Sequence, residues 1–111
     1  MAREAMSQYM RGTLDVLVLR TLLGAELHGY AIAALIEERA AGVLRIEDGA
    51  LYQALHRLEE RGWVESAWGH AETGKRARFY RLTGPGRRRL DAETETWNRF
   101  ARAVFAILEP A

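Results

Sequence analysis

The feature that most constrains this chain is a short amphipathic stretch, residues 48–61, that runs directly into two strand-like segments. Its apolar residues recur at i, i+3, i+4 and i+7, which predicts a helix with one buried stripe formed by Leu51, Ala54, Leu55 and Leu58. Asp48 is placed to cap the start of this helix, and Gly62 is placed to end it in the left-handed conformation. The stretch therefore predicts a complete helix that turns sharply into the next element.

Two strand-like runs follow, residues 63–68 and 76–82, and a Thr73-Gly74 turn separates them. Together they predict a β-hairpin. Its register stays open, so the sequence leaves undecided whether Phe79 or Tyr80 points inward. A short helix followed at once by a hairpin with a basic tip is the order of a winged helix-turn-helix.

Two further helices are expected ahead of this pair. The first begins after Thr13, a candidate cap, and ends at Gly24; the second covers residues 30–41 and ends at Gly42. Residues 43–46 are expected to form a short strand beside the hairpin. The predicted fold class is mainly α with a small β-hairpin: a winged helix-turn-helix over residues 12–83, followed by a long C-terminal helix over residues 84–109.

The C-terminal helix is predicted to carry an unusual amount of apolar surface. Thr83 can cap it, Pro85 is tolerated in its first turn, and no breaker interrupts residues 87–108. The preceding domain is too small to cover all of this surface, so we expect a homodimer interface. The alternative is a helix folded back on its own domain. The candidate interface residues are Leu90, Trp97, Phe100, Val104, Ile107 and Leu108.

Composition excludes several classes of protein. The chain has 111 residues, enough for one domain with a single core, and no cysteine, which excludes disulfides, thiolate metal sites and cysteine nucleophiles. No apolar run in the sequence approaches the length of a membrane span, and the first ten residues lack the apolar segment of a signal peptide. We therefore expect a cytoplasmic protein with no membrane partner and no cofactor.

Positive charge is concentrated in one short segment. The formal net charge is only +1, but seven of the 16 basic residues fall between residues 75 and 89, where there is no acid. The rest of the chain contains the other nine basic residues and all 15 acidic residues. This asymmetry is typical of a protein that binds a polyanion; the alternative is a solvated face that only keeps the protein soluble.

The polar side of the helix over residues 48–61 carries side chains that can hydrogen bond or stack. Gln pairs with adenine and Arg with guanine through two hydrogen bonds, so Gln53 and Arg57 fit contact with base edges. The alternative is a polar face that is only solvated. Tyr30 is expected to be a core aromatic whose hydroxyl reaches a phosphate. With the basic wing over residues 70–81, the candidate DNA-binding set is Tyr30, Ala50, Tyr52, Gln53, His56, Arg57, Lys75, Arg76 and Arg78.

Catalysis and metal binding find little support in the sequence. The three histidines have no ligand spacing, so His28 is expected to cap a helix or to pack. Neighbouring carboxylates such as Glu59 and Glu60 point away from each other on a helix, and no oriented nucleophile accompanies them. We predict no catalytic residue and no metal site.

Four separated motifs resemble, in order, those of the PadR family of transcriptional regulators: GTLDVLVLRTLL, LHGYAIAALIEE, IEDGALYQALHRLEERGWVES and RFYRLTGPGRRRL. The resemblance runs from Gly12 to about Leu90. The short tail is similar to the small subclass of that family, which has a single C-terminal dimerisation helix. The resemblance implies a dimeric winged-helix repressor whose C-terminal helices pack across the two subunits and which releases DNA when a ligand binds.

Within that resemblance, Leu51 and Tyr52 match the start of the family's recognition helix, and residues 75–78 match its wing. Gln53 stands where the family often has proline, which adds a hydrogen-bond donor and acceptor at this position. Trp97 occupies the helix in which some members hold flat aromatic ligands between paired helices. A buried tryptophan at the dimer interface is the alternative role for Trp97.

These observations favour a ligand-responsive, homodimeric repressor that is not an enzyme. It would read a near-palindromic site in double-stranded DNA with the helix over residues 48–61 and the wing over residues 70–81. Its expected partners are double-stranded DNA, a second copy of the chain, and a small aromatic or hydrophobic effector. The rival hypothesis is a winged helix that docks a protein with the same polar face, in which the basic wing is incidental.

Overall fold

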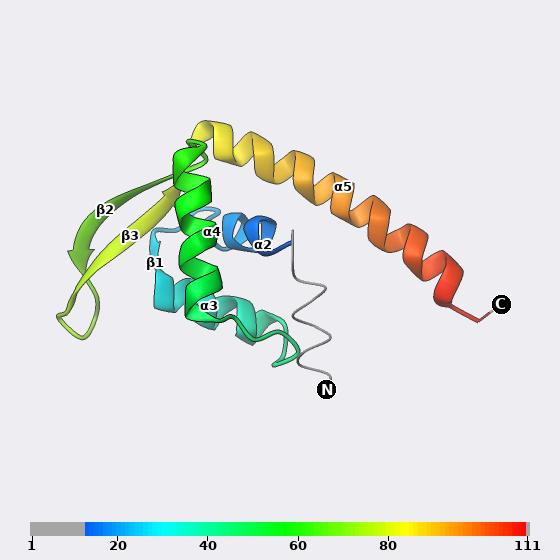
Figure 1. Cartoon of the computed structure of the whole chain (residues 1–111), viewed down its shortest axis with the longest axis horizontal. Helices are drawn as coiled ribbons and strands as arrows, with labels where there is room; N and C mark the ends of the chain where they lie inside the picture. The colour runs from blue at the N-terminus through cyan, green and yellow to red at the C-terminus, as the bar shows by residue number, and fades with distance from the viewer. Residues whose placement is uncertain (1–12, 111) are drawn as a thin grey trace.

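The computed structural model describes residues 13–110; residue 12, where the winged domain is expected to begin, lies outside them. Figure 1 shows short helices gathered beside a small sheet, and a long final helix that leaves them. The elements in order are α2 (Leu14–Thr21), β1 (Leu27–His28), α3 (Gly29–Arg39), α4 (Asp48–Glu60), β2 (Val64–His70), β3 (Arg76–Leu82) and α5 (Gly84–Leu108). The predicted fold class, a winged helix-turn-helix with a long C-terminal helix, is confirmed.

The centre of the molecule is the apolar contact among α2, α3 and α4. The predicted stripe of α4 is buried at all four positions: Leu51, Ala54, Leu55 and Leu58. These residues share one buried cluster with Val18 of α2 and Ile32 of α3. Burial of each large side chain contributes about 1.5–3 kcal/mol relative to leaving it exposed. This packing holds α4 with its opposite, polar side in solvent.

The two ends of α4 compare differently with the prediction. Glu47, not Asp48, is the capping residue, and its side chain makes no cap hydrogen bond within residues 13–110. Asp48 is instead the first helical residue, where a carboxylate still favours the positive end of the helix dipole. The other end is as expected: Gly62 has φ of 76°, and the N–H of Trp63 donates to the carbonyl of Leu58 at 3.0 Å.

The sheet has three antiparallel strands in the order β1-β3-β2. Tyr80 pairs with Leu27 on one side and with Ser66 on the other. This register settles which aromatic points inward: Tyr80 is buried in the core, whereas Phe79 lies on the opposite face of the sheet against Gly69.

The third strand is formed by Leu27 and His28, so the strand expected at residues 43–46 is a wrong prediction. Those residues form a loop. The backbone N–H of Ile46 donates to the Glu37 carboxylate of α3 at 2.8 Å, and the Ile46 side chain is buried. The loop is therefore fastened to a helix, and its backbone groups do not pair with the hairpin.

The start of α5 is joined closely to the end of α4. The Thr83 hydroxyl accepts from the N–H of Gly86 at 3.0 Å, as the predicted cap requires, and donates to the carbonyl of Gly62 at 2.6 Å. Gly86 lies so near the chain at Trp63 that a Cβ there would be 1.9 Å from the Trp63 carbonyl oxygen. This joint, formed by Gly62, Trp63, Thr83 and Gly86, fixes where α5 begins.

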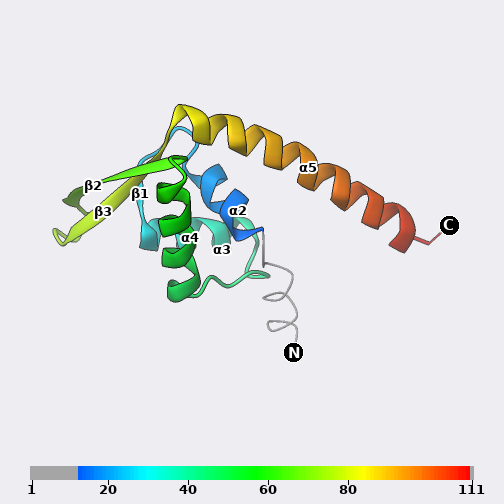
Figure 2. The same ribbon diagram turned by 45° about the horizontal axis from the view of Figure 1, so that its top comes forward.

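Beyond its first turns α5 runs away from the body, as Figure 2 shows. Leu90 is only 2% exposed and belongs to the core of this same chain. Its predicted place in a dimer interface is therefore corrected, because the body lies close enough to this part of α5 to bury the side chain. Within residues 13–110, no helix is long and apolar enough to cross a membrane.

Candidate nucleic-acid interface

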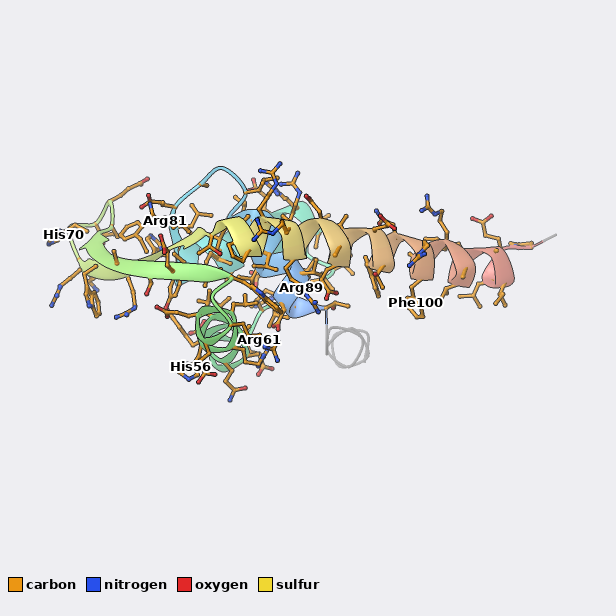
Figure 3. All side chains as sticks on the ribbon, turned by 90° about the horizontal axis from the view of Figure 1, so that it is seen from above. His56, Arg61, His70, Arg81, Arg89 and Phe100 are labelled. Carbon is orange, nitrogen blue, oxygen red and sulfur yellow. The ribbon has the colours of Figure 1, made fainter. Side chains whose placement is uncertain are left out.

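The polar side of α4 is open to solvent at every predicted position. Ala50, Tyr52, Gln53, His56 and Arg57 are all exposed. Figure 3, which looks along α4, shows His56 on the outer side of the helix and His70 far out on the hairpin. The sequence therefore predicted correctly which side of this helix is exposed.

Tyr30 differs from expectation. It lies at the start of α3 and is 80% exposed, so it is not the core aromatic that the sequence suggested. Its neighbour Gly29 comes so close to α4 that a Cβ would be 2.7 Å from the Tyr52 hydroxyl oxygen. This close approach brings the first turn of α3 against the predicted reading surface, and sequence reasoning gave Gly29 no role.

The wing lies on the same side as the polar face of α4. Because side chains alternate along a strand, Arg76, Arg78 and Tyr80 share one face of β3. Their partners on β2 include Trp68 and Ser66, and the Ser66 hydroxyl donates to the Glu59 carboxylate of α4 at 2.7 Å. The basic face of the hairpin is thus the face that packs toward α4.

A groove of about 1180 Å³ separates the start of α3 from the wing. Exposed aromatic rings line it from three elements: Tyr30 on α3, Tyr52 on α4 and Trp68 on β2. Lys75 and Arg76 lie along its wing side. The groove therefore combines cationic groups with flat apolar surfaces, a combination suited to a sugar–phosphate backbone.

Arg57 is not free, although it was predicted to read a base. Its guanidinium donates two hydrogen bonds to the Asp15 carboxylate of α2, at 2.7 and 3.4 Å. The hydrogen bond that Arg57 donates to this carboxylate raises the pKa of Arg57 above its ordinary value. Two of the five N–H donors of Arg57 are thus bound to Asp15, a contact that leaves three donors for a base.

We expect the Arg57–Asp15 pair to contribute a measurable coupling to stability. A double-mutant cycle with Arg57→Ala and Asp15→Ala is expected to give about 0.5–1 kcal/mol in denaturant unfolding, since the pair is bidentate but partly exposed. His56 and Glu60, an exposed pair at 3.5 Å, provide the control cycle, with an expected coupling near zero. Equal couplings in the two cycles would contradict a special role for the Asp15 contact.

The wing arginines have different surroundings. The Nε of Arg78 donates to the Ser66 hydroxyl at 2.8 Å, and its guanidinium lies 3.9 Å from the Glu59 carboxylate. The guanidinium carbon of Arg76 lies 4.4 Å from the centre of the Trp68 ring. Within the described part of the chain, Arg76 and Lys75 have no carboxylate partner. The Trp68 side chain is 56% exposed.

The basic segment that the sequence presented as one cluster is divided in space. Carboxylates on neighbouring positions pair with three of its members: Arg81 with Glu65, Arg87 with Asp91, and Arg89 with Glu93. Figure 3 labels Arg89 on the first turns of α5 and His70 at the far end of the hairpin. The cations that remain near α4 are those of the wing, so the basic surface is smaller than the sequence indicated.

His28 has the structural role that was expected of it. Its Nδ1 accepts from the backbone N–H of Ala31 at 3.2 Å and so caps α3, and its ring meets Phe79 edge-on at 5.3 Å. Among residues 13–110, no group of three or more histidine, cysteine or acidic side chains could hold a metal ion.

The sequence model of the PadR-like transcriptional regulator family matches residues 18–92 of this chain. The chain belongs to the PadR-like family. The matched residues include every candidate DNA-binding residue and end before Trp97. The family assignment therefore rests on the winged helix-turn-helix part of the chain.

Similar proteins agree with this PadR-like assignment. A transcriptional regulator of Mycobacterium tuberculosis is 31% identical over 99 residues, which cover 89% of each protein. A solved PadR family regulator from Eggerthella lenta is 30% identical with a TM-score of 0.79, covering 97% of this chain and 92% of that one. A solved transcriptional regulator from Clostridium thermocellum is 28% identical with a TM-score of 0.82, covering 92% of this chain and 99% of that one.

Proposed function

We propose that this PadR-like regulator is a homodimeric repressor that acts in the cytoplasm and reads a near-palindromic DNA operator with α4 and the wing. One observation carries the proposal: the exposed polar face of α4 and the free cations of the wing lie on the same side of one domain. When a recognition helix enters the major groove, cations on the same side of the domain can meet the phosphates beside it and fix its register.

The roles within this surface follow from chemistry. Gln53 is exposed on α4, and its amide can both donate to and accept from adenine. Lys75 and Arg76 lack carboxylate partners among the described residues, so they are available to phosphates. Tyr30, Tyr52 and His56 lie beside them as hydrogen-bonding or stacking groups. Arg57 differs from these residues, because two of its N–H donors already bind Asp15.

The exposed side of α5 supports a dimer built through the C-terminal helices. Phe100 is 57% exposed, Ile107 82% and Leu108 73%, and Trp97 and Val104 lie on the same side of the helix. A contiguous apolar surface of this kind on a helix that leaves its domain is typical of an interface. We therefore assign residues 12–83 to DNA binding and residues 84–109 to dimerisation.

A two-fold dimer would present two copies of α4 to one face of the duplex, with half-sites about 34 Å apart or at a multiple of that spacing. Control by a small aromatic or hydrophobic effector is part of the proposal. Its support is the ring pair of Trp97 and Phe100, whose centres lie 5.4 Å apart on the exposed side of α5. A flat ligand could stack on such a surface.

The decisive experiment is selection of duplexes from a randomised pool, followed by fluorescence anisotropy on the selected site. If each subunit neutralises about four phosphates, log affinity is expected to fall with log salt at a slope near −7. The rival hypothesis, a winged helix that docks a protein, predicts no selected site and no salt-sensitive binding to duplex DNA.

Two variants test the assigned roles. Arg76→Ala is expected to weaken binding to the selected site and to random duplex to a similar degree, because phosphates carry no sequence information. Gln53→Ala is expected to reduce mainly the preference for the selected site, by about 5- to 100-fold, since a good base contact contributes about 1–3 kcal/mol of discrimination. Equal losses on both duplexes for both variants would contradict these roles.

A further inference from the structure

A chain of contacts crosses from the recognition helix to the wing. It begins at the Glu59 carboxylate of α4, which accepts from the Ser66 hydroxyl of β2 at 2.7 Å. The same hydroxyl oxygen accepts from the Nε of Arg78 on β3 at 2.8 Å. One serine therefore uses its donor and its acceptor at once, and links three elements that are distant in sequence.

The charges along this chain complement each other. The side chains of Glu59 and Arg78 are 36% and 44% exposed, so both are partly shielded from water. Tyr80, which lies next to them, has its pKa raised, first by burial and then by the negative charge of Glu59. The Arg78 guanidinium supplies the opposite charge beside Glu59 and Tyr80. Hydrogen bonds to charged groups contribute more to stability than hydrogen bonds between neutral groups.

Trp68 separates Arg78 from Arg76. Both guanidinium groups lie over its ring, at 4.4 Å for Arg76 and 5.4 Å for Arg78. Stacking on an aromatic face limits the rotamers of a long side chain without occupying its N–H donors. Arg76 is thus held in place with its donors free, whereas Arg78 has committed its Nε to Ser66.

We propose that Arg78 is a positioning residue that ties the wing to the recognition helix through Ser66 and Glu59, and that Arg76, held on Trp68, makes the wing's phosphate contact. This inference rests on the DNA-binding function proposed above. The two wing arginines thus have different roles: Arg78 sets the distance between α4 and the wing, and Arg76 contacts the duplex.

The positioning role has a specific consequence for recognition. A selected site requires the helix and the wing to meet their partners at the same time, whereas random duplex can be held by cations in many registers. Loosening the tie should therefore reduce affinity for the selected site more than affinity for random duplex. The number of phosphates neutralised, and with it the salt slope, should stay the same.

The test compares Ser66→Ala with Ala67→Ser in the full-length chain. The first variant removes the hydroxyl; the second places one at the next position, which points to the opposite face of β2, and neither changes the charge. Ser66→Ala is expected to weaken binding to the selected site about 5- to 20-fold with an unchanged salt slope, and Ala67→Ser to bind as the parent does. Equal affinities of the two variants for the selected site would overturn the positioning role.

Salt dependence separates the two arginines. Arg76→Ala is expected to make the slope shallower by about 0.9 for each lost contact, or about 1.8 for a dimer. Arg78→Ala is expected to leave the slope near that of the parent while weakening the selected site. A slope that changes equally in both variants would show that Arg78 contacts phosphate, and would overturn the division.

An NMR measurement in the absence of DNA tests the contact between Arg78 and Ser66 separately from DNA binding. The Nε–H of Arg78 is expected to give a solvent-protected NMR signal in the parent and in Ala67→Ser, and to lose that protection in Ser66→Ala. An unprotected signal in the parent would overturn the tie even if DNA binding is found. A protected signal in a protein that binds no duplex would leave the tie standing, but would overturn both the phosphate role of Arg76 and the repressor function.

Discussion

A variant carrying Phe100→Glu and Ile107→Glu is expected to sediment as a monomer and to bind its selected DNA site about 100-fold more weakly than the parent, or worse. Both side chains are largely exposed on one side of α5, and two carboxylates there would have to be buried in the proposed interface. Without the dimer, each half-site is bound separately, and the gain of 10²–10⁴ that tethering typically provides is lost. Analytical ultracentrifugation and anisotropy measure the two effects on the same samples.

Ala106→Glu is the matched control for this experiment. At about 100° per residue, position 106 lies about 100–160° around α5 from positions 100, 104 and 107, and Ala106 is exposed. The control adds one negative charge to the same helix, so it separates the loss of an interface from simple repulsion of DNA. We expect it to remain a dimer with nearly parental affinity. A dimeric Phe100→Glu, Ile107→Glu protein would contradict the assignment of this surface.

Gly86→Ala is expected to destabilise the fold by about 3 kcal/mol or more, at the upper end of overpacking substitutions. The added Cβ would lie 1.9 Å from the carbonyl oxygen of Trp63, and backbone atoms cannot rotate away as a side chain can. For a chain of this length such a loss lowers Tm by more than about 12 °C. Calorimetry at a fixed protein concentration measures it, because the stability of a dimer depends on concentration.

Gly84→Ala provides the comparison within the same helix. A Cβ at Gly84 would meet only the end of the Arg88 side chain, at 3.9 Å, which is ordinary contact. This variant is expected to unfold within about 0.5 kcal/mol of the parent. If the two alanine variants melted together, the close contact between α5 and the chain at Trp63 would not be the reason that residue 86 is a glycine.

The elements that the sequence predicted well are those with local, periodic signals. The stripe of α4, the left-handed Gly62 and the cap at Thr83 all depend on residues within a few positions of one another. Local physics decides these features: amphipathic spacing, φ preference, and a hydroxyl within reach of an unpaired N–H. The choice of the polar face of α4 as the exposed surface follows from the same periodicity.

The features that escaped prediction depend on contacts between distant segments. The strand at Leu27 and His28 has only two residues, and it exists because β3 offers a free edge. Arg57 meets a carboxylate 42 residues away, and the link through Ser66 depends on a hairpin register that the sequence left open. Leu90 has the right spacing for an interface, but only the path of α5 shows that the core reaches it.

The joint at Gly62, Trp63, Thr83 and Gly86 has a mechanical consequence. With 25 residues at about 1.5 Å each, α5 is a rigid arm about 37 Å long. Its first turn is attached to the end of α4, because the Thr83 hydroxyl donates a hydrogen bond to the carbonyl of Gly62. A tilt of about 10° at this pivot displaces the free tip by roughly 6 Å. Conversely, in the proposed dimer, a shift of a few ångströms where the two C-terminal tips meet would correspond to only a small rotation of α5 about the joint.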